Sequence, residues 1–209
     1  MTRLRRTALL AFAVHLVAGV CMALILSRGL ETNSNLQDRL AFITDHHELW
    51  TFAWLTWTAA ALAILYFYAV FVEAHSVAPR LAVLLTVAAI GPDLAAQSIE
   101  IGVLPSLVGQ QELFLLLHRM AVLMSGYVAN GLYSLSAFLL AWSTRRAYPN
   151  WVWGAGVTVA VSGFGLSAAA LFNSTVGMFW TNVLLLPALL VWLAGVAYGR
   201  VNIDESCSR

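Results

Sequence analysis

Three polar residues share one face of an otherwise apolar segment, and of all residues in this sequence they are best placed to do chemistry. Asp93, Gln97 and Glu100 follow one another at spacings of four and three residues, which places all three on one helical face. Pro92 directly precedes Asp93 and removes a backbone donor. The sequence therefore predicts a kinked helix with a carboxyl group near the middle of the bilayer.

The next apolar segment supplies facing partners for these groups. Arg119, Asn130 and Tyr133 share a helical face that descends from the outer end of that segment to its middle. Matching depths across the two helices predicts that Glu100 pairs with Arg119 and that Asp93 pairs with Asn130. Together these residues form a candidate ligand- or proton-binding site.

A carboxylate such as that of Asp93 is tolerated inside a membrane only in certain surroundings. An ionised Asp at the bilayer midplane costs about 2.5 to 3.5 kcal/mol, so Asp93 must face the bundle interior, water or a partner. One interpretation is an outward-opening polar pocket between the third and fourth helices that binds or transports a small solute or a proton. Asp93 is then the protonatable centre, Gln97, Asn130 and Tyr133 orient the ligand, and Glu100 with Arg119 gates the mouth.

Two other interpretations stay open. The polar face is equally consistent with a structural or regulatory subunit of a membrane complex, because interhelical hydrogen bonds often serve packing alone. Alternatively, His46, His47 and His118 come at similar heights near the outer surface and offer nitrogen ligands for a metal or haem. That alternative predicts a membrane-bound enzyme or redox subunit, although histidines at a polar interface need no metal. No HxxxH, HExxH or CxxC pattern occurs.

Composition excludes most soluble classes of protein. The 209 residues are 61% hydrophobic and 10% charged, and the mean hydropathy is +0.81, whereas about a quarter of the residues in soluble proteins carry charge. All basic residues are arginine, and none form a patch beyond the amino-terminal cluster, which argues against nucleic-acid binding. The absence of lysine excludes Schiff-base chemistry.

Six apolar runs are each long enough to cross a hydrocarbon core of about 30 Å as a helix. We expect an all-α bundle forming one membrane domain, with spans at about 7–27, 49–72, 80–104, 114–142, 151–172 and 178–198. The segment 28–48 is an outer loop whose apolar face predicts a helix, either on the membrane surface or folded over the bundle. Residues 199–209 form a cytoplasmic tail.

Arginine distribution predicts the orientation of the bundle. Eight arginines fall on one side of the six spans, at the amino terminus, in alternate joints and in the tail, and only Arg28 and Arg39 fall in the loop on the other side. By the positive-inside rule both termini are cytoplasmic, and we expect a bacterial plasma membrane.

Two further patterns concern assembly. Shifting the chain by 103 residues lays His15 on His118 and the second span on the fifth, which predicts a weak inverted repeat of three spans plus three. The fifth span is rich in glycine and serine at four-residue intervals. Such small residues permit close helix approach and suggest either packing within the chain or contact with a homodimer or complex partner in the lipid bilayer.

Overall fold

The structure is a computed structural model, and it describes residues 2–199 of the chain. Within that range it is entirely helical. The elements, in chain order, are α1 (Arg3–Cys21), η1 (Met22–Leu26), α2 (Ser27–Gly29), α3 (Leu36–Asp45), α4 (His47–Ala74), α5 (Leu81–Ser98), η2 (Ile99–Val103), η3 (Leu104–Leu107), α6 (Gln111–Val122), η4 (Leu123–Ala129), α7 (Asn130–Ser143), α8 (Asn150–Leu171) and α9 (Thr175–Tyr198).

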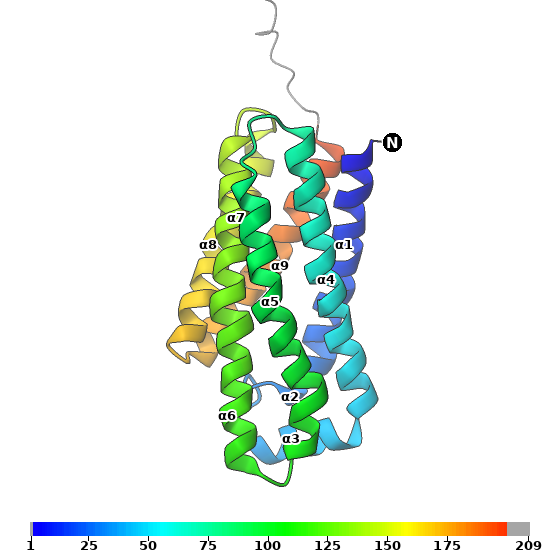
Figure 1. The fold of residues 1–209 in the computed structure, drawn as a ribbon, viewed down its shortest axis with the longest axis vertical. Helices are drawn as coiled ribbons and strands as arrows, with labels where there is room; N and C mark the ends of the chain where they lie inside the picture. Colours follow the sequence, from blue (N-terminus) through cyan, green and yellow to red (C-terminus); the bar gives the residue numbers. More distant parts are fainter. Residues whose placement is uncertain (1, 200–209) are drawn as a thin grey trace, which may run out of the picture.

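Six continuous helices are long and apolar enough to cross a membrane, which confirms the predicted number and suggests a membrane-integral protein. They run Arg3–Gly29, His47–Ala74, Leu81–Leu107, Gln111–Ser143, Asn150–Leu171 and Thr175–Tyr198, and each coincides with one predicted run. Each packs beside its neighbours in sequence, and α1 packs against α9, so the six helices close into an antiparallel ring (Figure 1). The predicted tail beyond Gly199 lies outside the described residues.

The helices differ in length, and this sets the two ends of the bundle apart. The helix from Gln111 to Ser143 has 33 residues whereas α8 has 22, so they measure about 50 Å and 33 Å. In Figure 1 the connection between α8 and α9 lies well short of the end that carries α3. Below, "the α3 end" means that end, and "the N-terminal end" means the opposite one.

Three of the spans contain π-helical turns. They are η1 in the first, η2 in the third and η4 in the fourth. Pro92 lies inside α5, where it leaves one backbone carbonyl without its helical donor. Because π turns are rare and gather at functional sites, their presence beside the predicted polar residues directs attention to that part of the bundle.

The segment predicted as a surface or folded-over helix is α3, and it folds over the end of the bundle (Figure 1). Asn35 caps its start by accepting hydrogen bonds from the next backbone amides. Its apolar face buries Leu40, Phe42 and Ile43. These side chains join a core cluster with Trp50 and Phe114 that closes the α3 end.

The N-terminal end has a different core, built from aromatic rings. Trp192 is 1% exposed, and its ring centroid lies 5.9 Å from that of Phe67 and 6.0 Å from that of Tyr68. Such edge-on contacts between aromatic rings stabilise a core beyond the area they bury. The small residues of α8 are also used within the chain, because a Cβ at Gly156 would lie only 2.8 Å from the Ala141 Cβ and 3.0 Å from Trp192 Nε1, which leaves no room for a side chain. The predicted contact of this helix with a partner chain stays a prediction.

Candidate functional site: a buried polar seam between α5 and α6–α7

Asp93 is the central acid of the seam. Its side chain belongs to a residue only 7% exposed, on the inner face of α5. The Ser125 hydroxyl donates to Oδ1 at 2.6 Å, and the Tyr133 hydroxyl donates to Oδ2 at 3.2 Å. Both partners come from the η4–α7 helix. Tyr133, which the sequence predicts to orient a ligand, thus contacts Asp93 directly, and each carboxylate oxygen has one hydroxyl donor.

Asn130 does not pair with Asp93, so that predicted pairing is wrong. Its amide donates instead to the backbone carbonyl of Gly163 on α8, at 3.3 Å. The cause is η4, which ends directly before Asn130. A π turn holds more residues than an α turn, and it therefore changes the direction in which the following side chains point. An unbroken α-helical period cannot anticipate this rotation.

Gln97 continues the seam one turn from Asp93. The residue is 3% exposed, and its side-chain oxygen accepts a short hydrogen bond from the Thr58 hydroxyl of α4. This contact joins the second span to the third. By its spacing in the helix, Gln97 lies on the same face as Asp93 and Glu100 and is one turn away from each.

Glu100, one turn further along, contacts His118 instead of its predicted partner Arg119. Glu100 is 1% exposed, and its Oε1 lies 2.9 Å from His118 Nδ1, within ion-pair distance but without the geometry of a hydrogen bond. The other ring nitrogen, Nε2, lies 2.6 Å from Oε2 of Glu31. Glu31 follows α2 in the connection to α3. One imidazole thus bridges two carboxylates from segments far apart in the sequence.

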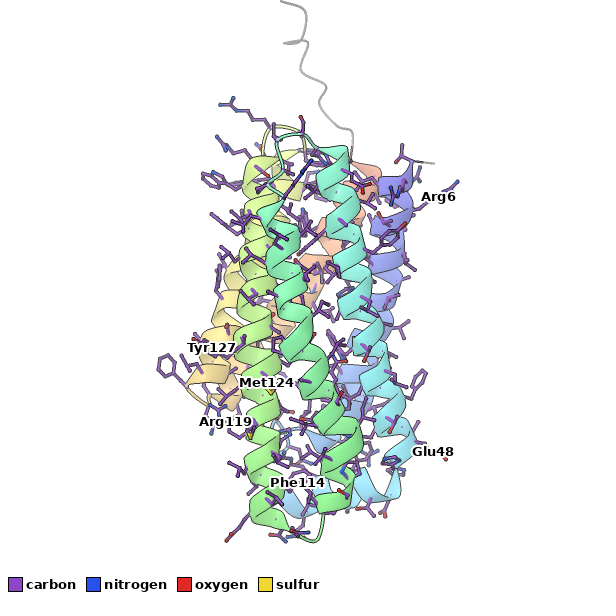
Figure 2. All side chains as sticks on the ribbon, viewed as in Figure 1. Arg6, Glu48, Phe114, Arg119, Met124 and Tyr127 are labelled. Carbon is purple, nitrogen blue, oxygen red and sulfur yellow. The ribbon has the colours of Figure 1, made fainter. Side chains whose placement is uncertain are left out.

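Arg119 lies one residue further along α6 and serves another helix. Its guanidinium donates to the carbonyls of Ala170 at 2.7 Å and of Leu171 at 3.0 Å. These carbonyls belong to the last turn of α8, where no intrahelical donor remains and a cation is favourable. The predicted pair of Glu100 with Arg119 is therefore wrong, because the short α8 ends at the height of Arg119 and takes it as a cap (Figure 2).

Arg39 of α3 completes the charges at this end. It is 6% exposed, donates from Nε to the Gly29 carbonyl at 3.0 Å, and lies over the Phe114 ring at 5.8 Å. Burial lowers its pKa, while the charges of Glu31 and Glu100 act in the opposite direction. Burial by itself would raise the pKa of Glu31, but the hydrogen bond and charge of His118, together with Arg39, lower it below its ordinary value.

Three buried atoms of this cluster have no hydrogen-bond partner within the described residues. They are Oε2 of Glu100, Nη2 of Arg39 and Nδ1 of His118. Buried polar atoms are nearly always paired, so such exceptions point to a role other than packing. The charged cluster of Glu31, Arg39, Glu100 and His118 is called the outer cluster below.

The other histidines of the predicted metal site do not join His118. His46 and His47 are both exposed where α3 meets α4, and the His46 ring lies against Phe42. Across residues 2–199, no group of three or more His, Cys, Asp or Glu side chains gathers with the geometry of a metal site. The metal or haem interpretation therefore stays a prediction from the sequence.

The seam is closed in this structure. Two surface hollows, of about 510 and 370 Å³, are lined by residues such as Glu112 and Tyr127, and neither is lined by Asp93, Gln97 or Glu100. Figure 2 shows Phe114 near the α3 end, where it belongs to the core cluster that also contains Ile43 and Trp50. Asp93, Gln97 and Glu100 are all buried, and the outward-opening pocket stays a prediction.

Sequence reasoning did not identify four residues of this arrangement: Glu31, Arg39, Thr58 and Ser125. Ser125 and Tyr133 are eight residues apart, about two helical turns, and that spacing was a usable signal. Glu31 and Arg39 lie in a polar loop in which charge ordinarily means solvent, and no local pattern marks them as buried.

Comparison with known proteins finds no match: no family model, no curated protein and no solved structure resembles this chain.

Proposed function

We propose that this multi-pass membrane protein binds or transports a small solute or a proton along the seam between α5 and α6–α7, with Asp93 as its protonatable centre. The observation that carries the proposal is the setting of Asp93. It is buried, both its oxygens accept hydroxyl hydrogen bonds, and among the described residues no basic side chain lies within ion-pair distance. A proton bound there changes the charge of the bundle interior, which a structural hydrogen bond does not need.

Backbone irregularity supports the same proposal. Pro92 weakens the helix directly before Asp93, η4 supplies Ser125, and η2 supplies Glu100. Intramembrane helices that bind solutes are commonly broken at the binding site, because freed backbone groups and wider turns allow side chains to change partners. Gln97, Ser125 and Tyr133 then orient the bound species. Asn130 and Arg119 instead donate hydrogen bonds to backbone carbonyls of α8, and we assign neither of them to the ligand.

The orientation is part of the proposal. We place both termini in the cytoplasm of a bacterial cell, because arginines concentrate at the N-terminal end, and the α3 end then faces outward. Labelling of single cysteines introduced at Glu112 and at Arg145 with a membrane-impermeant reagent tests this, since only the first should react in intact cells.

The inverted repeat of three spans plus three also stays part of the proposal. It is supported by π turns in the first and fourth spans, η1 and η4, which the repeat would place at corresponding positions.

The test of Asp93 is a flux measurement in liposomes. Purified protein is reconstituted with an internal pH-sensitive dye, and a potassium diffusion potential drives protons. Asp93→Asn keeps the shape and removes the charge, and we expect at least a tenfold loss of flux with an unchanged elution profile. Asp38→Asn, at an exposed acid of α3, is the matched control and should retain the flux.

If the unaltered protein moves no protons, the solute form of the proposal is tested by ligand-dependent thermal stabilisation across a panel of small polar compounds. A stabilising compound whose effect disappears in Asp93→Asn supports that form. Normal proton flux in Asp93→Asn, or a stabilising effect that the substitution leaves unchanged, would overturn the central role of Asp93.

A further inference from the structure

The outer cluster places one imidazole between two carboxylates of unequal exposure. The side chain of Glu31 is 20% exposed, that of His118 is 5% exposed and that of Glu100 is 2% exposed. The distances from the ring nitrogens to the two carboxylates are 2.6 and 2.9 Å. The three groups thus form a row that begins at solvent and ends inside the bundle.

A purely structural salt bridge would be completed differently. A buried ionic network is favourable only when its remaining donors and acceptors are satisfied. Here Oε2 of Glu100 and Nη2 of Arg39 are buried without partners within residues 2–199, although both residues are more than nine-tenths buried. The Glu100 oxygen is available to a proton or a water molecule that arrives and leaves, and the Arg39 nitrogen is available to a water molecule.

The row ends on the helical face that also carries Asp93. Glu100, Gln97 and Asp93 lie on one face of α5–η2 at intervals of one turn, and the Thr58 and Ser125 hydroxyls flank this face. Trp50 holds the turn in place, because its indole N–H donates to the Glu100 carbonyl at 2.8 Å. A proton that reaches Glu100 is therefore two helical turns from Asp93.

We propose that Glu31, His118 and Glu100 form a proton-entry relay that leads from the α3 end to the seam, and that the species moved by this protein is the proton. This inference rests on the proposed function and identifies its substrate. It also makes Glu31 and His118 carriers of the proton, a role that the function proposed for the seam does not give them.

The transfer balances with the groups present. The resting ring of His118 carries a proton on each nitrogen. Its Nδ1–H bond breaks as that proton passes to Oε1 of Glu100, which leaves a neutral ring with its proton on Nε2. A proton from solvent binds the Glu31 carboxylate, and rotation of the ring turns Nδ1 toward Glu31. The O–H bond of Glu31 then breaks as Nδ1 takes the proton, which restores the imidazolium between two carboxylates.

Arg39 is a positioning residue in this scheme. Its guanidinium lies near both glutamates and is held by the Gly29 carbonyl and by the Phe114 ring. Phe114 also stacks on His118, with ring planes 10° apart. The charged groups that face His118 are therefore Glu31 from the α2–α3 connection, Glu100 from η2 and Arg39 from α3.

The first experiment uses the full chain in liposomes, with the dye assay described above. Glu31→Gln keeps the shape of the side chain but cannot carry a proton, and we expect at least a tenfold fall in proton flux. Asp38→Asn is the control at a solvated acid on the same side and should be unchanged. His118→Ala should lose flux to a similar degree and regain at least part of it when imidazole is added at the α3 side. Unchanged flux in Glu31→Gln, or no rescue of His118→Ala, overturns the relay.

The second experiment does not depend on flux. Protein with ¹⁵N-labelled histidine reports the protonation of both ring nitrogens of His118, assigned by its loss in His118→Gln. We expect the exchange of the His118 ring proton with solvent to slow at least tenfold in Glu31→Gln and to stay unchanged in Asp93→Asn. If the exchange rate is the same in Glu31→Gln as in the unaltered protein, the relay is overturned even if Asp93 proves essential. Exchange that depends on Glu31 in a protein without proton flux overturns the proton as the species moved, keeps the exchange path through Glu31, and leaves the solute form of the Asp93 proposal to the thermal-stabilisation test.

Discussion

Two histidines at opposite ends of the bundle have opposite surroundings. At the N-terminal end, His75 donates from Nδ1 to the Phe71 carbonyl and accepts at Nε2 from the Tyr148 hydroxyl, so a neutral ring is fully paired. At the α3 end, His118 lies between two carboxylates in a cluster that leaves three buried atoms unpaired. The first histidine is arranged to keep one protonation state, and the second is arranged to change it.

Backbone and core follow the same division. The aromatic core around Trp192 lies among α-helices without π turns, although α9 contains Pro187, whereas η1, η2 and η4 all lie toward the α3 end or next to the seam. Regular helices with close aromatic contacts resist rearrangement, and π turns allow side chains to change partners. The comparison teaches that one end supplies stability while the other retains polar groups that cost stability, and three substitutions test this.

The largest expected effect is in the aromatic core. Trp192→Ala removes the ring that Phe67, Tyr68 and Phe71 surround, and we expect a loss of about 3 to 5 kcal/mol in the free energy of unfolding. Unfolding by a denaturing detergent, followed by circular dichroism, measures it. Trp192→Phe, which keeps an aromatic ring, should cost clearly less. Equal losses in the two variants would show that ring packing is not what this core contributes.

An intermediate effect is expected at the outer cluster. Arg39→Met leaves Glu31 and Glu100 with one cation fewer, and we expect a loss of about 3 kcal/mol at pH 7. Arg39→Lys, which keeps the charge, is the control and should lose less. In the unaltered protein the pKa of Glu31 is lowered, so its contribution is present above the ordinary value of 4.5 and disappears as pH falls through the lowered value.

Without Arg39 the pKa of Glu31 rises toward its ordinary value, so its contribution is smaller and its loss should be complete at a higher pH. Denaturation curves of the unaltered protein and of Arg39→Met between pH 3 and pH 8, all at one ionic strength, measure that displacement. Curves that differ by a constant amount across this range would contradict the charge coupling and would assign the effect of Arg39 to packing on Phe114.

The smallest effect belongs to His75 at the N-terminal end. Tyr148→Phe removes one hydrogen bond, and we expect a loss of about 1 kcal/mol at pH 8. Burial lowers the pKa of His75 despite its bond to Phe71. Its neutral form is therefore fully stabilising above the ordinary value of 6.5, and stability declines as pH falls below that value toward the lowered one.

His75→Gln should remove that decline, which a series of unfolding temperatures between pH 5 and pH 8 will show. An unchanged pH profile in His75→Gln would mean that another group causes the decline. Proton flux should be normal in both Tyr148→Phe and His75→Gln, because no step of the proposed relay or seam uses either side chain. A tenfold loss of flux in either would contradict the division between the two ends.

The sequence by itself determined the number of helices and which face of α5 is polar, because both follow from local periodicity. Each apolar run is helical since only a helix pairs its own backbone groups in lipid, and the spacing of Asp93, Gln97 and Glu100 fixes their common face. The buried histidine of α1 was predictable for the same reason, and His15 does bond to the Ala11 carbonyl at 2.8 Å.

Only the tertiary structure decided which partners these side chains have. Asn130 turns to α8 because η4 changes the rotation of its helix, Arg119 caps α8 because that helix is short, and His118 meets Glu31 because α3 folds back over the bundle. Each outcome depends on a helix end, a wide turn or a loop whose placement comes from contacts between distant segments. Helical period and depth carry no information about such contacts, so pairings inferred from depth alone failed where the helices depart from regular geometry.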